Sequence, residues 1–241
     1  MKIFKRFVFI LSLCLIIGAC KTTTKARVQE QEFKVNIKSS NTAVGSIELQ
    51  FGTLLGIGKI NKRNIDVLYY PKEDAVCLKY NYEFYNYYQF WDKKGRLAFL
   101  EALQKYNEDY EARKLDRKEK AQKKYGTVRG YLVWQQLAIT IQAHNNNYID
   151  LGYSFKNNSP YFTIFQRETE YNNPNDRDNS RVSPNISMYF TRAQAANLAE
   201  IFEQYKDTPE ANYSDDDGYD QDYYIESDKP PAKDNIPKDA Y

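Results

Sequence analysis

The stretch that decides the fold runs from residue 76 to residue 110, VCLKYNYEFYNYYQFWDKKGRLAFLEALQKYNEDY. Apolar side chains occupy every second position from residue 76 to 84, a period that is typical of a half-buried strand. After Asp92 the apolar positions recur three and four residues apart, which predicts a helix carrying Leu97, Leu100, Leu103, Tyr106 and Tyr110. This stretch therefore predicts a strand that leads directly into a helix.

The same order of elements occurs on both sides of this stretch. Alternating apolar residues predict strands around 47–51 and 65–69 in the first half, and around 131–141, 149–155, 161–165 and 186–190 in the second. Thr191-Arg192-Ala193-Gln194 has the spacing of a capping box, in which the threonine and glutamine side chains satisfy free backbone amides at a helix start. A second helix is expected from there to Tyr205.

These elements predict an α+β fold, an antiparallel sheet with helices on one face. Two strand-strand-strand-helix repeats, residues 44–124 and 126–206, align at an offset of 99 residues, which indicates an internal duplication. Chance similarity between two strand-to-helix junctions is the open alternative.

The segment 111–125 is almost entirely charged. Opposite charges four residues apart, such as Asp116 and Lys120, would support an exposed extension of the first helix. Both a basic contact surface and a solvated bridging helix are consistent with this composition.

The first twenty residues have the features of a secretory signal. A basic start, residues 1–6, precedes 13 uncharged residues, 7–19, fewer than the about 20 apolar residues that a membrane-spanning helix needs. Residues 17–20, Ile-Gly-Ala-Cys, resemble the lipobox of bacterial lipoproteins. The resemblance implies that residues 1–19 form a cleaved signal peptide and that Cys20 carries a diacylglyceryl thioether. It also implies that fatty acids such as palmitate hold the chain in a membrane, and Lys21 in place of Asp favours the outer membrane.

Three regions follow the predicted signal peptide. Residues 20–32 lack apolar periodicity and are expected to be a lipidated tether, residues 33–206 form the α+β domain, and residues 207–241 form a disordered acidic tail. The tail contains 11 acids and three bases, a net charge of −8, whereas residues 20–206 have a net charge of +7. The two regions either attract each other or simply keep the protein in solution.

Candidate chemical groups are few. His144 has no second histidine for a metal site and no recognisable nucleophile, so we expect a strand-end or turn residue. Cys77 is expected to be a small buried side chain, because with Cys20 lipidated it has no disulfide partner. The glycines between Gly52 and Gly58 predict a hairpin turn rather than a phosphate loop, since no helix follows them.

The acidic tail does not form a calcium loop of the EF-hand type. If Gly218 is the sixth residue of such a loop, the first and twelfth positions are Tyr213 and Tyr224, where acidic ligands are required. Weak cation binding by Asp215 and Asp217 is the remaining possibility. No cofactor and no bound metal are expected.

A cluster of aromatic residues is the most unusual feature of the predicted domain. Its rings either fill the core or form a binding surface on the outer face; they are Tyr80, Tyr82, Tyr85, Tyr87, Tyr88 and Trp91. In element order alone, about residues 60–206 are similar to the PUR and Whirly families, which bind single-stranded nucleic acid on their sheets. No sequence motif of those families is found here, so no binding residue can be assigned from them.

The sequence thus predicts a membrane-anchored envelope lipoprotein that is a non-catalytic binding or scaffolding module. Its expected partners are the membrane and another envelope protein or polymer. Two alternatives are a module for single-stranded nucleic acid and an enzyme of unrecognised type that acts through His144. Export argues against a genomic ligand.

Overall fold

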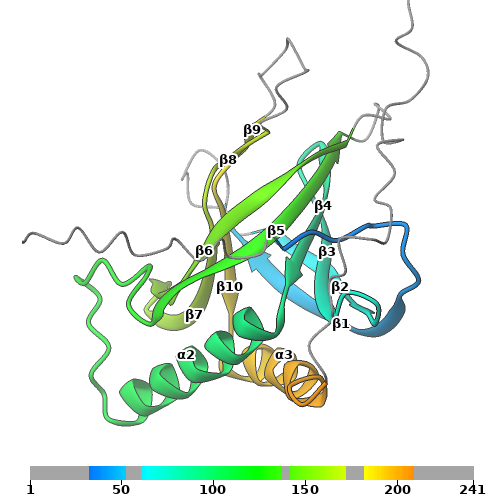
Figure 1. Ribbon diagram of the computed structural model, residues 1–241. Helices are drawn as coiled ribbons and strands as arrows, with labels where there is room; N and C mark the ends of the chain where they lie inside the picture. Colours follow the sequence, from blue (N-terminus) through cyan, green and yellow to red (C-terminus); the bar gives the residue numbers. More distant parts are fainter. Residues whose placement is uncertain (1–32, 53–60, 137–141, 172–181, 209–241) are drawn as a thin grey trace, which may run out of the picture. The chain divides into compact units, whose positions relative to one another are not determined.

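The computed structural model describes residues 33–52, 61–136, 142–171 and 182–208. This part of the chain contains ten strands and two helices (Figure 1). The first half consists of β1 (Thr42–Phe51), β2 (Asn61–Tyr70), β3 (Ala75–Tyr82), β4 (Tyr85–Trp91) and α2 (Lys93–Glu111). The second half consists of β5 (Gly126–Gln136), β6 (Gln142–Lys156), β7 (Ser159–Gln166), β8 (Thr169–Glu170), β9 (Val182–Ser183), β10 (Ile186–Phe190) and α3 (Arg192–Gln204).

Eight of these strands form a closed barrel in the order β1-β10-β7-β6-β5-β4-β3-β2, with every pair of neighbours antiparallel. β4 pairs with β5, where Tyr87 lies opposite Trp134, and β1 pairs with β10, where Gln50 lies opposite Tyr189. The two halves are therefore joined at both edges. The predicted α+β sheet with helices on one face is wrong, because the alternation of side chains does not reveal which strand edges pair.

The predicted strand-strand-strand-helix repeat is also wrong, and in the first half the missed strand is β4. β3 ends at Tyr82, and a tight turn leads into the separate strand β4. Glu83 has a positive φ of 53° in this turn, and the side chain of Phe84 is 72% exposed. Phe84 continues the alternation of apolar residues seen in β3. The sequence pattern therefore runs on through residues 83 and 84, where the chain turns. Four barrel strands precede each helix, and the short β8–β9 hairpin lies between β7 and β10.

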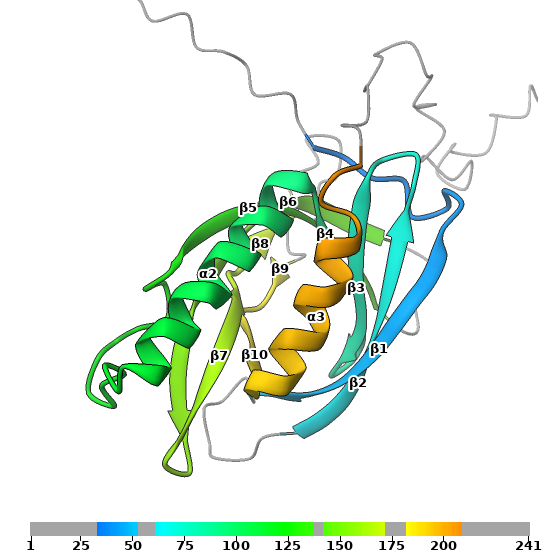
Figure 2. The ribbon, with the colours of Figure 1, turned by 90° about the horizontal axis from the view of Figure 1, so that it is seen from below.

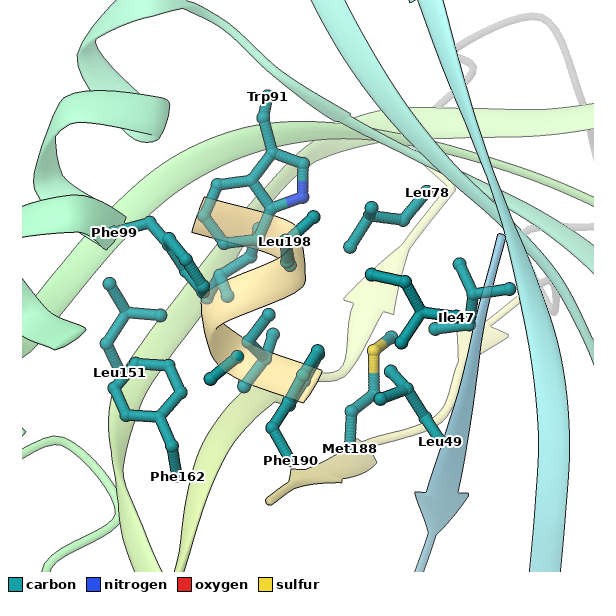
Figure 3. Close-up of a cluster of buried hydrophobic side chains, with 14 of the residues drawn as sticks. Ile47, Leu49, Leu78, Trp91, Phe99, Leu151, Phe162, Met188, Phe190 and Leu198 are labelled. Carbon is teal, nitrogen blue, oxygen red and sulfur yellow. The ribbon is translucent and has the colours of Figure 1, made fainter. Parts of the chain in front are cut away.

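One apolar core fills the barrel and continues under the helices. An eight-stranded barrel is just wide enough for side chains to fill its interior. Ile47 of β1, Leu78 of β3 and Met188 of β10 belong to the same buried cluster as Phe99 of α2 and Leu198 of α3 (Figure 3). Seen along the barrel, α2 and α3 lie across one end of it (Figure 2). The helices thus close an end of the barrel instead of covering a face of a sheet.

Both helices begin directly after a barrel strand and at equivalent positions. The side chain of Asp92 accepts a hydrogen bond from the Gly95 amide at 2.7 Å and caps α2. Thr191 caps α3 and forms the predicted capping box with Gln194, which confirms that local prediction. Asp92 and Thr191 are separated by the offset of 99 residues on which the predicted duplication rests.

The outer surface of β2–β5 is covered by residues 33–37, which we call the strap. Phe33 and Val35 are buried against the outward-facing side chains of these strands, which are Tyr70, Ala75, Cys77, Phe90, Tyr131 and Val133. The ring of Phe33 meets the ring of Tyr131 edge to face, with centroids 6.3 Å apart. The strap gives the barrel a second, smaller core on its outside.

The predicted extension of the first helix through residue 125 is wrong. α2 ends at Glu111, and Arg113 has a positive φ of 55° immediately afterwards. Residues 112–125 form a loop without helix, which we call the basic loop. The loop returns to the barrel where the Tyr153 amide donates to the Ala121 carbonyl at 3.1 Å and the Tyr125 amide donates to the Leu151 carbonyl at 2.9 Å.

Candidate functional site

The aromatic cluster belongs mainly to the core. Tyr80, Tyr82, Tyr87 and Trp91 are at most 4% exposed and point into the barrel. Burial raises the pKa values of Tyr80 and Tyr87 above the usual tyrosine value. Tyr85 packs at the edge of this core, whereas Tyr88 lies half-buried on the outer face beside the strap. These rings therefore do not form a common exposed surface.

A polar network occupies part of the barrel interior. The side-chain oxygen of Gln166 accepts hydrogen bonds from the Tyr80 hydroxyl at 2.8 Å and from the Gln89 amide at 3.0 Å. Gln89 in turn accepts from the Trp91 indole at 3.2 Å, and Gln166 donates to the Ser183 hydroxyl of β9 at 3.0 Å. Buried polar groups are tolerated when they are bonded in this way. The network fixes the β8–β9 hairpin to the barrel.

A pocket of about 330 Å³ lies on the other side of the barrel wall, on the outer face of β6, β7 and β10. We call it the outer pocket. Its base contains Thr163, which is paired across strands with Tyr189 of β10 and Gly152 of β6. Thr163 is only 4% exposed, and its hydroxyl has no hydrogen-bond partner among the described residues. Ser154 and Ser187 add further hydroxyl groups from the neighbouring strands.

The basic loop forms one wall of the outer pocket. Arg117, Glu119, Lys120 and Gln122 line the pocket from this loop. The loop can lie flat on β6 because position 152 is glycine: a Cβ there would collide with the backbone carbonyl of Ala121. The glycine at position 152 therefore shapes the pocket, although nothing in its sequence context distinguished it.

Aromatic rings form the other sides of the pocket. Phe155 and Phe165 are half-buried, and Tyr189 is 7% exposed. The Arg117 guanidinium lies 5.4 Å from the centre of the Phe155 ring, and the Lys156 amino group lies 4.7 Å from the centre of the Tyr189 ring. These distances are within the range of cation–π attraction. The pocket thus combines ring edges, hydroxyl groups and cations.

The single acid in the wall of the pocket is held by its neighbours. Glu119 accepts hydrogen bonds from the Tyr153 hydroxyl at 2.6 Å and from the Lys124 amino group at 3.0 Å. These two donors lower the pKa of Glu119. Burial and the bond to Glu119 raise the pKa of Tyr153. At neutral pH the wall therefore has an ionised Glu119 with local partners, and Lys120 has no carboxylate partner within the described part of the chain.

The residues that the sequence singled out lie elsewhere. His144 is the third residue of β6, opposite Val133, so it lies near the start of the strand, as expected, and not in a turn. Its side chain is exposed on the outer face, and its Nδ1 lies 2.9 Å from the Tyr131 hydroxyl. Cys77 is fully buried beneath the strap, as predicted, and burial raises the pKa of its thiol.

Several other predictions fall outside the described residues. These are the signal peptide, the lipidated Cys20 and its tether, and the acidic tail beyond residue 208 with its candidate cation ligands. Most of the glycine-containing segment 52–58 is also outside them, although antiparallel pairing of Phe51 with Asn61 shows that β1 and β2 form a hairpin around it. Within the described ranges, no group of three or more histidine, cysteine, aspartate or glutamate side chains is placed to hold a metal ion.

No helix in the described part of the chain is sufficiently long and apolar to cross a membrane.

A family model described as "Uncharacterised Treponema protein" matches residues 20–206. No curated protein and no solved structure matches the chain. Because the family model covers well over half of the 241 residues, the chain belongs to this family of uncharacterised Treponema proteins.

Proposed function

We propose that the protein is a lipid-anchored lipoprotein of the bacterial envelope, placed in the outer membrane, and that its barrel is a non-catalytic binding module. The basic start, the short apolar run and the lipobox-like residues 17–20 support the anchor. A lipid with two acyl chains, or more, holds a protein stably where a single chain gives marginal binding.

The outer pocket carries the binding part of this proposal. It is concave, it has a mixed apolar and polar lining, and the buried hydroxyl of Thr163 in it has no partner among the described residues. A buried hydroxyl without a hydrogen bond costs free energy, so a ligand that bonds to it recovers that cost. Ligand sites are usually pockets that are largely preformed and in which a small number of polar groups point toward the ligand.

The position of the strap is compatible with an anchored barrel whose pocket stays accessible. The strap covers the outer surface of β2–β5, whereas the pocket lies on the outer face of β6, β7 and β10, so the two use different strands of the closed barrel. The tether that begins at Cys20 reaches the strap at Phe33 and spans at most about 45 Å when extended. In this proposal the anchored chain joins the barrel through the strap on β2–β5, strands that do not line the pocket.

The environment of His144 supports binding rather than catalysis. The imidazole is exposed on β6 beside Tyr131 and is not among the residues that line the pocket. A histidine that acts as a base must reach the proton of a bound substrate. We expect His144→Ala to leave binding in the outer pocket unchanged.

The anchor is tested by replacing the two cysteines of the predicted mature chain. Cys20→Ala removes the sulfur that the thioether needs, so we expect loss of fatty-acid labelling, an uncleaved signal peptide and release from membranes washed with carbonate and high salt. Cys77→Ala is the matched control and should be labelled and processed normally. Mass spectrometry of the mature amino terminus identifies the modification. Wild-type membrane retention of the Cys20→Ala chain, without any lipid label, contradicts the proposal.

The binding module is tested by photo-cross-linking in intact cells. A photoreactive residue at Gln122, in the wall of the outer pocket, should capture an envelope component. The same residue at Lys105, on the exposed side of α2, should not capture it. Equal capture from both positions contradicts a role for the pocket.

A further inference from the structure

We propose that the outer pocket binds an acidic sugar, that is, a sugar unit bearing a carboxylate or phosphate group. The inference rests on the proposed binding function and adds the chemical class of the ligand. It follows from three properties of the pocket: its hydroxyl groups, its rings and its unpaired cation.

The hydroxyl groups lie on three adjacent strands, each displaced by two residues along the sheet from the one on the neighbouring strand. Thr163 of β7 lies between β6, which supplies Ser154, and β10, which supplies Ser187. A hydroxyl both donates and accepts hydrogen bonds, and it rotates to suit its partner. A row of such groups is complementary to a ligand that itself has several hydroxyls, and Thr163 is already desolvated in the free protein.

The size and the rings of the pocket agree with a single sugar unit or two. A volume of about 330 Å³ is at the lower end for small-molecule sites. Phe155 and Phe165 line the same pocket and add apolar carbon to the hydroxyl groups. A sugar ring has the matching properties, with apolar C–H faces and a polar rim.

The charge of the wall selects an acidic ligand. The basic loop contains seven bases and two acids, and the amino group of Lys120 faces no carboxylate partner among the described residues. Arg117 is held over Phe155 by its hydrogen bonds to Asn158, the shorter at 2.9 Å. A guanidinium and an ammonium group in the wall of one pocket suit a ligand that carries a carboxylate or phosphate, which accepts hydrogen bonds from such groups.

Single-stranded nucleic acid fits these observations less well. Binding of a strand uses a groove that follows the backbone and exposed rings on which successive bases stack. The large exposed aromatic side chains of the described residues are Phe84, Tyr110 and Tyr148, and none of them lines the outer pocket. They lie on the β3–β4 turn, on α2 and on β6.

The test measures binding of four probes to the mature full-length chain by titration calorimetry at low salt. The probes are a uronic acid disaccharide, a sugar monophosphate, the disaccharide with its carboxylates reduced to alcohols, and a twelve-nucleotide single strand. We expect at least one acidic sugar to bind at least ten times more tightly than the neutral one. Whichever of the two acidic probes binds more tightly shows whether the site prefers a carboxylate or a phosphate group.

Variants connect the binding to the pocket. Thr163→Val retains the shape of the side chain and removes the hydroxyl, so we expect about tenfold weaker binding without a lower thermal midpoint. Lys120→Ala should also weaken acidic sugars about tenfold. Lys118→Ala, which removes the same charge from the same loop but not from the pocket wall, should change the affinity less than twofold.

Four results overturn the inference. Equal affinity for the neutral and acidic disaccharides excludes the class of ligand, and tighter binding of the single strand assigns the site to nucleic acid. If no sugar binds, or if Thr163→Val and Lys120→Ala leave sugar binding intact, the outer pocket is not a sugar site. The proposed function fails on separate evidence, namely the cross-linking from Gln122 and the membrane retention of Cys20→Ala.

Discussion

Arg96 has no exposed side-chain surface, although it carries a charge near the start of α2. Its guanidinium donates to both carboxylate oxygens of Asp74, at 2.9 and 3.0 Å, and to the backbone carbonyls of Trp91 and Tyr205. The hydroxyl of Thr208 also donates to Asp74, at 2.6 Å. This one side chain therefore ties the β2–β3 turn, the end of β4 and the end of α3 together.

Replacement of this arginine should have a large effect on stability. Arg96→Met leaves the Asp74 carboxylate with less than a tenth of its surface exposed and without its counter-charge, so we expect a loss of about 3–5 kcal/mol in the free energy of unfolding. Urea denaturation measures it. Lys105→Met is the control, because its ion pair with Glu101 is exposed on both sides and contributes about 0.2–0.5 kcal/mol. Equal effects of the two changes would mean that the buried pair does not hold these elements together.

The distance between partners along the chain explains which of these residues could be predicted. Thr191 and Gln194 are three residues apart, and a helix start brings any such pair together. Arg96 and Asp74 are 22 residues apart, and they meet only once the β2–β3 turn and α2 are in place. Thr163 was equally hidden, because its position beneath the basic loop depends on the pairing of three strands.

At the scale of elements, the strap is a segment that links the predicted tether to the barrel wall. The side chains of Phe33 and Val35 cover Cys77, which is completely buried and has a raised pKa. Thiol reagents attack the thiolate of an accessible cysteine, so the rate of modification of Cys77 reports whether the strap is in place.

Removing the apolar contacts of the strap should therefore expose this thiol. In the chain that starts at Lys21, Cys77 is the single cysteine, and we expect the combined changes Phe33→Ser and Val35→Ser to increase its rate of modification at least tenfold. The rate is measured with a chromogenic disulfide reagent. Phe84→Ser, which removes an aromatic ring that is 72% exposed, should leave the rate unchanged. An unaltered rate in the strap variant would show that other elements bury Cys77.

The basic loop shows why a charge pattern did not predict an element. Opposite charges four residues apart stabilise a helix by only about 0.2–0.5 kcal/mol per pair. In the structure, Lys124 instead bonds to Glu119 and lies 3.5 Å from Asp109, and Ala121 is buried on β6. Long-range contacts with the barrel thus replace the weak local preference, and they also create the wall of the outer pocket.

At the scale of the whole molecule, the sequence predicted most strands and both helix starts. It did not predict that the strands close into a barrel. The alternation in β3 identifies an inner face, yet Ala75 and Cys77 on its other face are buried as well. Burial on both faces follows from the strap, which is 38 or more residues away from these positions along the chain. The pairing of β1 with β10 joins segments still further apart, and no local pattern encodes it.

The acidic tail is the last part of the molecule whose contribution can be tested. The described part of the chain ends at Thr208, whose hydroxyl donates to Asp74 and to the Tyr205 carbonyl and whose carbonyl accepts from Lys93. Residues 210–241 are rich in acidic residues and prolines, and charged residues separate their tyrosines. Such a sequence does not form a continuous apolar face that could be buried.

Deleting residues 210–241 should therefore leave the thermal midpoint within about one to two degrees of the full-length value, because changes away from buried contacts rarely exceed about 0.5 kcal/mol. Differential scanning calorimetry measures it. A matched variant, the same deletion with Thr208→Ala, should lower the midpoint further, since Asp74 loses a hydrogen bond at 2.6 Å. A loss of stability that appears in the deletion alone and disappears in high salt would show that the tail, with its net negative charge, docks on the basic barrel.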